Sequence, residues 1–244
     1  MSDSSPDPPP IVALHGFTQT GRSWDPLIDR LRARRPGLRI AAPDLPGHGD
    51  GGDACDLATA AADLARRFGR SIWIGYSMGG RHLLRLAVDH PATVAAMVLI
   101  STTAGIDDAT ERAARRTADE ALADRIEEIG TDAFLDEWTA QPMFAGRLPD
   151  DDRTSRSTTA AGLADSLRRA GTGAMEPVWD AVQHSTIPAL VIAGADDVKF
   201  ATIAQRLTGS LRDSRLRIVP GASHATHLER PDLVADAVVD WLGR

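Results

Sequence analysis

The chain has 244 residues, of which 43% are hydrophobic and 25% charged, and its formal net charge is −7. This length fits one large domain or two small ones, and the composition is ordinary for a globular protein. The negative charge and the absence of Lys/Arg runs argue against general nucleic-acid binding. Cys55 is the only cysteine, which excludes an intrachain disulfide and a metal site built on cysteines.

The first ten residues do not predict a signal peptide. Residues 1–10 lack the basic-then-apolar pattern of a signal peptide, and their Ser, Asp and Pro residues predict a disordered lead-in. No apolar run approaches the roughly 18 residues of a membrane span. We therefore expect no membrane-spanning segment and a cytoplasmic location. The sequence is compatible with a monomer but does not determine the oligomeric state.

Short apolar runs alternate with helical patterns along most of the chain. The apolar runs predict strands over 11–14, 38–42, 71–75, 94–100, 188–193 and 216–219. Helical patterns cover 24–34, 54–68 and 233–242. This alternation predicts an α/β fold, in which helices cover both faces of a mostly parallel sheet.

The span 106–177 interrupts this alternation. It has no convincing strand, and its helical patterns cover 109–129, 131–140 and 160–170. We expect an all-helical insertion of this kind to cap the carboxyl ends of the strands, where open α/β sheets bind ligands. Packing against the side of the sheet is the alternative. The predicted division is a core of 11–105 and 178–244 and a helical cap of 106–177.

The stretch Gly75-Tyr-Ser77-Met-Gly79 fits the G-x-S-x-G nucleophile elbow, between a predicted strand and a predicted helix. A serine on such a sharp turn brings the flanking backbone very close to the preceding strand. Side chains two residues before and after the serine would collide, so both positions favour glycine. An ordinary Gly/Ser loop is the alternative, and the partners of the serine decide between the two interpretations.

A serine nucleophile or base needs a histidine to take its proton and a carboxylate to orient that histidine. In proteins built on this elbow, the three residues follow along the chain in the order Ser, acid, His. Asp197 lies in the loop after the fifth predicted strand, and His224 lies in the loop after the sixth. We choose Asp197 over Asp196 because it lies deeper in the loop. Asp197 as a helix cap and His224 as a turn residue are the alternatives. The predicted triad is Ser77, Asp197 and His224.

The oxyanion hole is expected to use backbone N–H groups of Phe17 and Met78, the latter being the residue after the nucleophile. His15 follows the first predicted strand, and we interpret it as structural rather than catalytic. The remaining histidines before the triad histidine are interpreted as loop, surface or helix-end residues: His48, His82, His90 and His184.

These motifs, with His15-Gly-Phe17 and Pro43-Asp-Leu-Pro-Gly-His-Gly49, resemble those of α/β-hydrolase-fold enzymes. Within that fold, the elbow through Arg81 closely resembles the 2-succinyl-6-hydroxy-2,4-cyclohexadiene-1-carboxylate (SHCHC) synthase family, which are lyases of menaquinone biosynthesis. The chain departs from that family in the alanine and threonine after Ser157 and in Ala195-Asp196. The resemblance continues through Glu111-Arg-Ala-Ala-Arg115, Asp136-Glu-Trp138-x-x-Gln141-Pro-x-Phe144, Arg156-Ser157 and Asp197-Val-Lys199-Phe200.

The resemblance implies a small-molecule substrate with three carboxylates. Guanidinium groups bind carboxylates bidentately and are costly to desolvate without an anion. Arg81 lies one helical turn after Ser77 on the same face, which directs it toward the pocket. Arg115 and Arg156 come from the cap, where solvated positions are the alternative. The resemblance implies that the substrate-binding residues are Arg81, Arg115, Arg156, Tyr76, Trp138 and Phe144, although Trp138 and Phe144 could instead form cap core.

The resemblance also implies a lyase that eliminates pyruvate from an enolpyruvyl cyclohexene carboxylate to give SHCHC. The triad would then act as a base, and the reaction needs no metal or organic cofactor. The first alternative is a serine hydrolase of the same fold that acts on an ester or a C–C bond of a carboxylated substrate. The second is a non-catalytic binding protein, which an intact triad disfavours.

Overall fold

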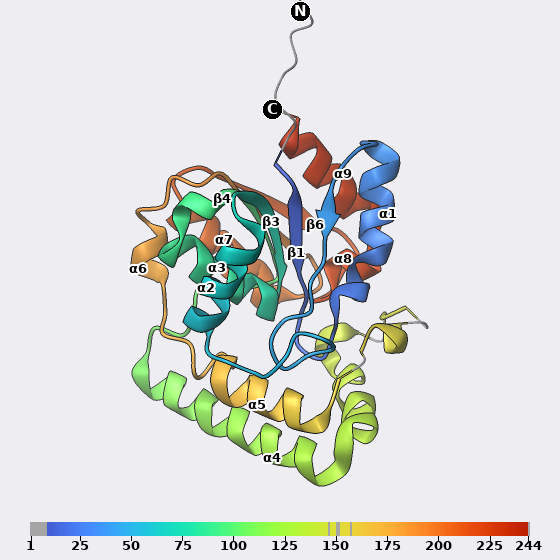
Figure 1. The fold of residues 1–244 in the computed structure, drawn as a ribbon, viewed down its shortest axis with the longest axis vertical. Coiled ribbons are helices and arrows are strands. Elements are labelled where there is room, and N and C mark those ends of the chain that lie inside the picture. Colours follow the sequence, from blue (N-terminus) through green and yellow to red (C-terminus); the bar gives the residue numbers. More distant parts are fainter. Residues whose placement is uncertain (1–8, 146, 150–151, 157, 244) are drawn as a thin grey trace, which may run out of the picture.

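A computed structural model of the chain describes residues 9–145, 147–149, 152–156 and 158–243, which form a central sheet with helices on both faces (Figure 1). Residues 1–8 of the predicted lead-in and Ser157 lie outside the described residues. Within the described ranges, no helix is long and apolar enough to cross a membrane.

The sheet has six parallel strands in the order β2-β1-β3-β4-β5-β6. The predicted strands are all present, although β2 is shorter than its predicted span. Because the order reverses at β1, the loops after β1 and β3 meet at a topological switch point, where open α/β sheets bind ligands. The strand bounds are β1 (Ile11–Leu14), β2 (Ile40–Ala41), β3 (Ser71–Tyr76), β4 (Val94–Ile100), β5 (Ala189–Gly194) and β6 (Ser214–Val219).

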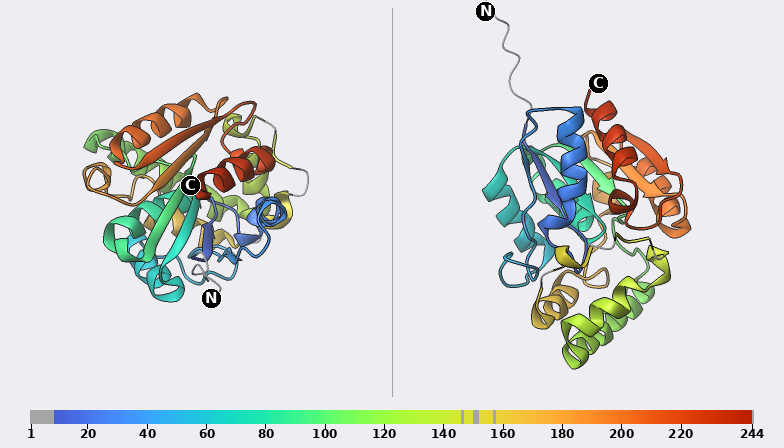
Figure 2. Two further views of the ribbon diagram at one scale, coloured as in Figure 1. Left: turned by 90° about the horizontal axis from the view of Figure 1, so that it is seen from above. Right: turned by 90° about the vertical axis from the view of Figure 1, so that its right-hand side faces the viewer.

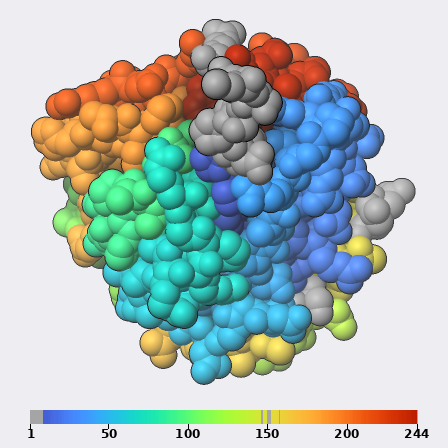
Figure 3. Space-filling view, turned by 45° about the horizontal axis from the view of Figure 1, so that its top comes forward, coloured from blue at the N-terminus to red at the C-terminus, as the bar shows by residue number. Residues whose placement is uncertain are grey.

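Helices cover both faces of the sheet, as the alternation of elements predicts (Figures 1 and 2). Residues of α2, α3, α6 and α7 pack in the core on one face, and residues of α1 and α9 pack on the other. Helices α1 and α9 lie side by side at the molecular surface (Figure 3). The helix bounds are α1 (Asp25–Arg34), α2 (Leu57–Phe68), α3 (Met78–Asp89), α6 (Trp179–Val182), α7 (Val198–Ser210), α8 (Thr226–Glu229) and α9 (Pro231–Leu242).

The continuous apolar runs of the strands reflect burial on both faces. In β1, Val12 and Leu14 belong to the core beneath α2 and α3, whereas Ile11 and Ala13 belong to the core beneath α1 and α9. Successive side chains of a strand point to opposite faces, so a strand that is covered on both sides needs apolar residues at every position. The sheet is therefore held rigidly between two helical layers.

Between β4 and β5 the chain forms the helices α4 (Ala109–Thr139) and α5 (Ala160–Ala170), beyond the carboxyl ends of the strands (Figures 1 and 2). The range of α4 contains the two helices predicted over 109–129 and 131–140, which meet at a kink where Gly130 has the non-helical angles φ 79° and ψ 169°. Helices α4 and α5 share a small apolar core of their own. The division into core and cap at 106 and 177 stays a prediction.

An ion-pair network also joins α4 to α5. The guanidinium of Arg168 on α5 contacts the carboxylates of Glu120, Asp124 and Glu127 on α4 at 2.7–3.2 Å. These pairs lie near the surface, so each contributes little to the free energy of unfolding. Together with the apolar core they make the two helices one packed unit.

Candidate active site

Ser77 lies on the sharp turn between β3 and α3 in a backbone conformation that is uncommon for a residue with a side chain. Its φ is 49° and its ψ is −108°. Such a conformation persists only where the surrounding structure holds it in place. The end of β4 does so, because the Ser77 N–H donates to the carbonyl of Ile100 over 2.9 Å. The hydroxyl of Thr102 donates to the Ser77 carbonyl over 2.8 Å.

The two glycines of the elbow occupy positions where a side chain would collide, as the sequence predicts. A Cβ atom on Gly75 would lie 2.6 Å from the carbonyl oxygen of Gly79. A Cβ atom on Gly79 would lie 2.0 Å from the carbonyl oxygen of Leu14, at the end of β1. The elbow therefore packs backbone against backbone, which presents Ser77 at the carboxyl edge of the sheet.

The three residues of the predicted triad lie in one hydrogen-bonded row. His224 Nδ1 lies 2.7 Å from Asp197 Oδ2, and His224 Nε2 lies 3.1 Å from Ser77 Oγ. Because the carboxylate only accepts, Nδ1 carries the proton and Nε2 is left to accept from the serine hydroxyl. This is the geometry in which a histidine removes a proton from serine.

Asp197 also caps a helix, so both interpretations of this residue describe the structure. Its Oδ1 accepts from the N–H of Phe200 in the first turn of α7 over 3.1 Å, while its Oδ2 faces His224. Its neighbour Asp196 points away and pairs with Arg147 at the surface. The cap fixes the carboxylate so that one oxygen remains directed at the imidazole.

His224 is enclosed by aromatic rings from both the core and the segment after α4. The ring of Phe200 lies 4.4 Å from the imidazole, that of Tyr76 5.4 Å and that of Phe144 6.2 Å, between centroids. The His224 N–H donates to the carbonyl of Met143 over 3.2 Å. This packing limits access of water to the imidazole.

The loop after β1 is shaped by His15, which is fully buried. Its Nε2 accepts from the N–H of Leu45 over 2.9 Å, and its Nδ1 lies 2.8 Å from the carbonyl oxygen of Gly16. Burial lowers the pKa of His15 well below its usual value, so the ring stays neutral. His15 is therefore structural, and it fixes the backbone that leads to Phe17.

The backbone N–H groups assigned to the oxyanion hole come from two elements that meet at the elbow. Met78 is the first residue of α3, so its N–H is one of the helix N-terminal donors without a partner inside the helix. Phe17 follows the loop that His15 holds. Gly79 brings these segments together through its close approach to Leu14. Their role as oxyanion donors stays a prediction.

Two histidines that the sequence places in loops, surfaces or helix ends are buried. His48 does lie in a loop, where its Nε2 accepts from the N–H of Thr18 over 3.3 Å. His82 lies inside α3, with Nδ1 3.0 Å from the carbonyl oxygen of Met78, so its prediction was wrong. Desolvation lowers the pKa of each ring to about 4, and both are neutral at pH 7.

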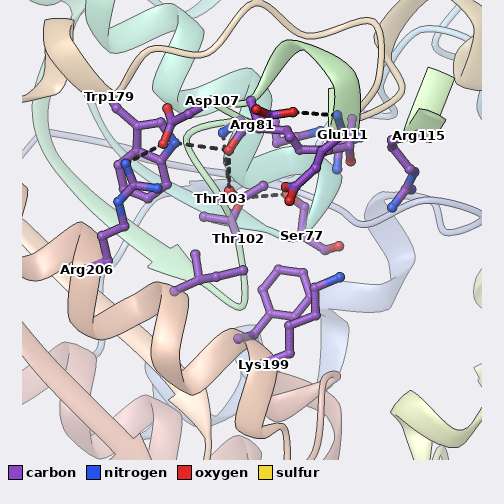
Figure 4. A pocket seen from close by; sticks show the side chains of 16 residues that line it. Ser77, Arg81, Thr102, Thr103, Asp107, Glu111, Arg115, Trp179, Lys199 and Arg206 are labelled. Carbon is purple, nitrogen blue, oxygen red and sulfur yellow. Dashed lines mark hydrogen bonds and ion pairs between the residues drawn. The ribbon is translucent and has the colours of Figure 1, made fainter. Parts of the chain in front are cut away.

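A cavity of about 410 Å³ opens beside Ser77 (Figure 4). Its walls come from the loop after β4, the start of α4 and the start of α7. The wall residues combine cations, carboxylates and hydroxyls with apolar side chains, as expected for a pocket that binds a charged small molecule. The charged side chains are Arg81, Arg115, Lys199, Arg206, Asp107, Asp108 and Glu111.

Arg81 lies in this cavity, one turn after Ser77 on α3, as the spacing predicts. Its Nη2 donates to the carbonyl of Ala170 over 3.0 Å, and its buried Nε has no partner among the described residues. Within the described ranges it forms no ion pair with a carboxylate. Desolvation, and then the nearby charge of Arg115, lower its pKa to about 10. Arg81 is therefore a cation that an anionic ligand would stabilise.

Arg115 lines the same cavity but already has a carboxylate partner. Its Nε donates to Asp119 Oδ1 over 2.7 Å, and Asp119 is buried. The second oxygen of Asp119 accepts from the N–H of Gly173 over 2.9 Å. Asp119 therefore holds the Nε edge of the guanidinium, and no hydrogen bond engages its other nitrogens within the described ranges.

Arg156 does not join the other two arginines. It lies with Tyr76, Trp138 and Phe144 in a narrow crevice of about 10 Å³ on the other side of Ser77. Its Nε donates to Asp152 over 2.6 Å, and its Nη1 contacts the hydroxyl of Thr18. Of the three arginines that the resemblance assigns to substrate binding, Arg156 therefore lies apart from Arg81 and Arg115, and its guanidinium is paired with Asp152.

The aromatic residues that the resemblance assigns to the pocket line this crevice. The Phe17 ring lies 5.1 Å from that of Trp138, whose own ring lies 6.2 Å from that of Phe144. Phe144 is buried in the core that also contains Tyr76. Burial raises the pKa of Tyr76 above its usual value, so the phenol keeps its proton. These side chains line the crevice and also pack in the core, and their role in substrate binding stays a prediction.

Several cavity residues are missing from the predicted site. Lys199, the only lysine of the chain, lies two residues after the triad carboxylate. Arg206 stacks at 3.7 Å over the ring of Trp179 and pairs with Asp107 at 2.5 Å, which closes one side of the cavity. A signal for Lys199 was its place in the first turn after Asp197. No such signal marked Trp179 or Arg206, because the fold alone brings them together.

In the part of the chain that the structure describes, no cluster of three His, Cys, Asp or Glu residues has the arrangement of a metal site.

Comparisons with known proteins match this chain over nearly its whole length. A sequence model described as the alpha/beta hydrolase family matches residues 11–237. A protein of Serratia proteamaculans named SHCHC synthase is 30% identical, over 99% of this chain and 96% of its own. A Bacillus subtilis protein that carries the same name provisionally is 36% identical, over 95% of this chain and 89% of its own.

Among solved structures, this chain is similar to MenH from S. aureus. The TM-score is 0.90 at 25% sequence identity, and the match covers 97% of this chain and 94% of the other. The similarity therefore extends over the helices between β4 and β5 as well as the sheet.

Proposed function

We infer the reaction from two facts: the chain belongs to the alpha/beta hydrolase family, within its SHCHC synthases, and its serine faces a cavity in which Arg81 forms no ion pair with any described residue. We propose that it is a lyase that eliminates pyruvate from an enolpyruvyl cyclohexene carboxylate and gives SHCHC. In this proposal the cavity takes a small-molecule polycarboxylate, as a cytoplasmic step of menaquinone biosynthesis.

The observation that carries the proposal is Arg81. Its guanidinium is partly buried without a carboxylate, and its Nε has no partner among the described residues, one helical turn from Ser77. A neutral ester gives no compensation for this buried charge, whereas a substrate carboxylate does. Arg115 lines the same cavity and supports binding of a second carboxylate.

The proposed chemistry uses the triad as a base. Asp197 orients His224, and His224 accepts the proton of Ser77 Oγ as that oxygen removes the proton α to the succinyl ketone. The electron pair of the broken C–H bond moves to the ketone oxygen, which the N–H groups of Phe17 and Met78 stabilise. The enolate then collapses, the ring C–O bond breaks, and the enolpyruvate leaves and takes up a proton to become pyruvate.

The helices between β4 and β5 complete the proposed site. We propose that the span 106–177 acts as a cap, which supplies Arg115 on one side of Ser77 and Arg156, Trp138 and Phe144 on the other. The contact of Arg81 with Ala170, at the end of α5, supports this, since it joins the elbow helix to the cap directly. The cap would then shield the enolate from water.

The test is pyruvate release from the enolpyruvyl precursor, generated enzymatically, with p-nitrophenyl esters assayed in parallel. The wild type should release pyruvate efficiently, and Ser77→Ala should lose at least about 1,000-fold in kcat while keeping its thermal stability. Retention of more than about a tenth of the rate would exclude Ser77 as the base. Fast ester turnover without pyruvate would instead identify a hydrolase.

A further inference from the structure

Thr102 is a cavity residue that contacts the nucleophile elbow through its hydroxyl. It lies in the loop after β4, is 4% exposed and lines the cavity beside Ser77 (Figure 4). Its Oγ1 donates to the carbonyl oxygen of Ser77 over 2.8 Å. That carbonyl belongs to the peptide group whose N–H is Met78's, one of the two donors assigned to the oxyanion hole.

This hydrogen bond fixes the direction of the Met78 N–H. A trans peptide group is planar, so its C=O and N–H point in opposite directions. A donor that holds the Ser77 carbonyl therefore also sets where the N–H on the other side points. The backbone N–H of Arg81 reaches the same carbonyl at 3.3 Å, so the Thr102 hydroxyl makes the shorter contact.

The packing around Thr102 leaves the elbow little freedom to turn. A Cβ atom on Gly80 would lie 2.5 Å from the Thr102 Cβ, so this side chain rests directly on the first turn of α3. The Ser77 N–H is held by Ile100, in the strand that leads to Thr102. The end of β4 thus holds both backbone polar groups of Ser77, whose φ of 49° needs such support.

We propose that Thr102 is a positioning residue of the oxyanion hole. Its hydroxyl orients the Ser77–Met78 peptide group and polarises it, because hydrogen bonds in series strengthen one another by roughly 10–30% per bond. The Met78 N–H becomes a better aligned and stronger donor to the enolate oxygen. This inference rests on the proposed function for the assignment of Met78 as an oxyanion donor.

The test compares Thr102→Val, which keeps the shape and removes the hydroxyl, with Thr102→Ser, which keeps the hydroxyl. We expect Thr102→Val to lower kcat for pyruvate release by about tenfold, as loss of a supporting hydrogen bond does elsewhere, with KM within about twofold. Thr102→Ser should stay within about threefold of the wild-type kcat. Thr102→Ala, which adds no atoms near Gly80, replaces the valine variant if that variant does not fold.

Two results would overturn the inference. If Thr102→Val raises KM and leaves kcat unchanged, the hydroxyl binds substrate and does not position the peptide group. If Thr102→Ser loses as much kcat as Thr102→Val at equal melting temperature, the hydroxyl is not what matters.

A second readout separates this inference from the proposed function. Phosphonylation of Ser77 by a fluorophosphonate also develops negative charge on an oxygen that the oxyanion donors stabilise. The inference predicts slower labelling of Thr102→Val and recovery in Thr102→Ser, even if the chain releases no pyruvate and the lyase assignment fails. Equal labelling of all three proteins, alongside normal pyruvate release, would overturn the role of Thr102 and leave the lyase intact.

Discussion

Replacing Arg81 with methionine should make the protein more stable and less active. Desolvation lowers the Arg81 pKa from 12.5 to about 10, so its charge destabilises the fold by about 3 kcal/mol at any pH below 10. Water in the cavity screens part of this destabilisation, which leaves about 2 kcal/mol. The methionine variant also loses the hydrogen bond to the Ala170 carbonyl, which costs about 1 kcal/mol. We therefore expect the free energy of unfolding to rise by about 1 kcal/mol, or roughly 2–4 °C in Tm.

The effect on activity has the opposite sign. A hydrogen-bonded charge pair with a substrate carboxylate contributes about 1.5–3 kcal/mol, so kcat/KM for pyruvate release should fall by about 10- to 150-fold. Urea unfolding at pH 7 and a steady-state pyruvate assay on the same preparations measure both quantities.

The matched control is Arg85→Met, one turn further along α3. Arg85 pairs with Asp89 through two nitrogens at 2.6 Å and does not line the cavity. This variant should lose up to about 1 kcal/mol of stability and keep its activity. If Arg81→Met is instead the less stable of the two variants and releases pyruvate at the wild-type rate, Arg81 does not bind a substrate carboxylate.

Three further predictions follow from the geometry. Asp197→Asn should lower kcat by about 10,000-fold through the wrong imidazole tautomer, whereas Asp196→Asn should keep it; equal kcat values in the pyruvate assay would contradict this. The folded chain keeps His82 neutral down to pH 4 while the unfolded chain protonates it below 6.5, so stability is lost as pH falls through this window. His82→Gln should flatten that loss by about 1.4 kcal/mol per pH unit, and an unchanged slope in urea titrations would refute it. Gly79→Ala should prevent folding or lower Tm strongly, because the new Cβ would lie 2.0 Å from a carbonyl oxygen of β1. Gly209→Ala places its Cβ in open space on α7 and should raise Tm by about 2–4 °C. A Tm for Gly79→Ala above that for Gly209→Ala in thermal scans would disprove the packing argument.

The elbow could be predicted from the sequence because its requirements are local. Gly75 and Gly79 flank Ser77 at positions where the turn itself excludes a side chain, so their spacing alone predicts the geometry of the turn. Asp197 and His224 could be placed because each follows a predicted strand, and parallel strands deliver their loops to one edge of the sheet. The resemblance added the arginines, which composition and spacing alone would not select from the others.

The different surroundings of the three arginines were harder to predict, although the sequence held a signal. Asp119 lies four residues after Arg115 and Asp152 four residues before Arg156, and both pairs form. Residues three and four away from Arg81 include no acid. Acids at helical spacing pair with arginine. Of these three arginines, the pattern therefore distinguishes Arg81, which has no carboxylate partner among the described residues.

Burial of His82 could not be predicted, because its surroundings come from segments far away in the sequence. Its apolar neighbours Leu83, Leu84 and Leu86 define the face of α3 that packs on the sheet, which suggests that a histidine beside them faces outward. His82 is nevertheless buried, with His48 near enough to contribute to the lowering of its pKa. Tertiary packing determines the burial of His82, and no rule based on the local sequence predicts it.

The position of Lys199 allows the cavity to be labelled covalently at one amine. It is the only lysine of the chain, it is exposed, and it lies at the wall of the cavity beside Arg81 and Arg115. Lys199 is therefore the only side-chain amine that an acylating reagent can modify, and it lies at the wall of the proposed substrate cavity. Immobilising the protein through lysine would obstruct its own cavity, whereas a mass tag on this one amine would report how far a bound ligand shields it.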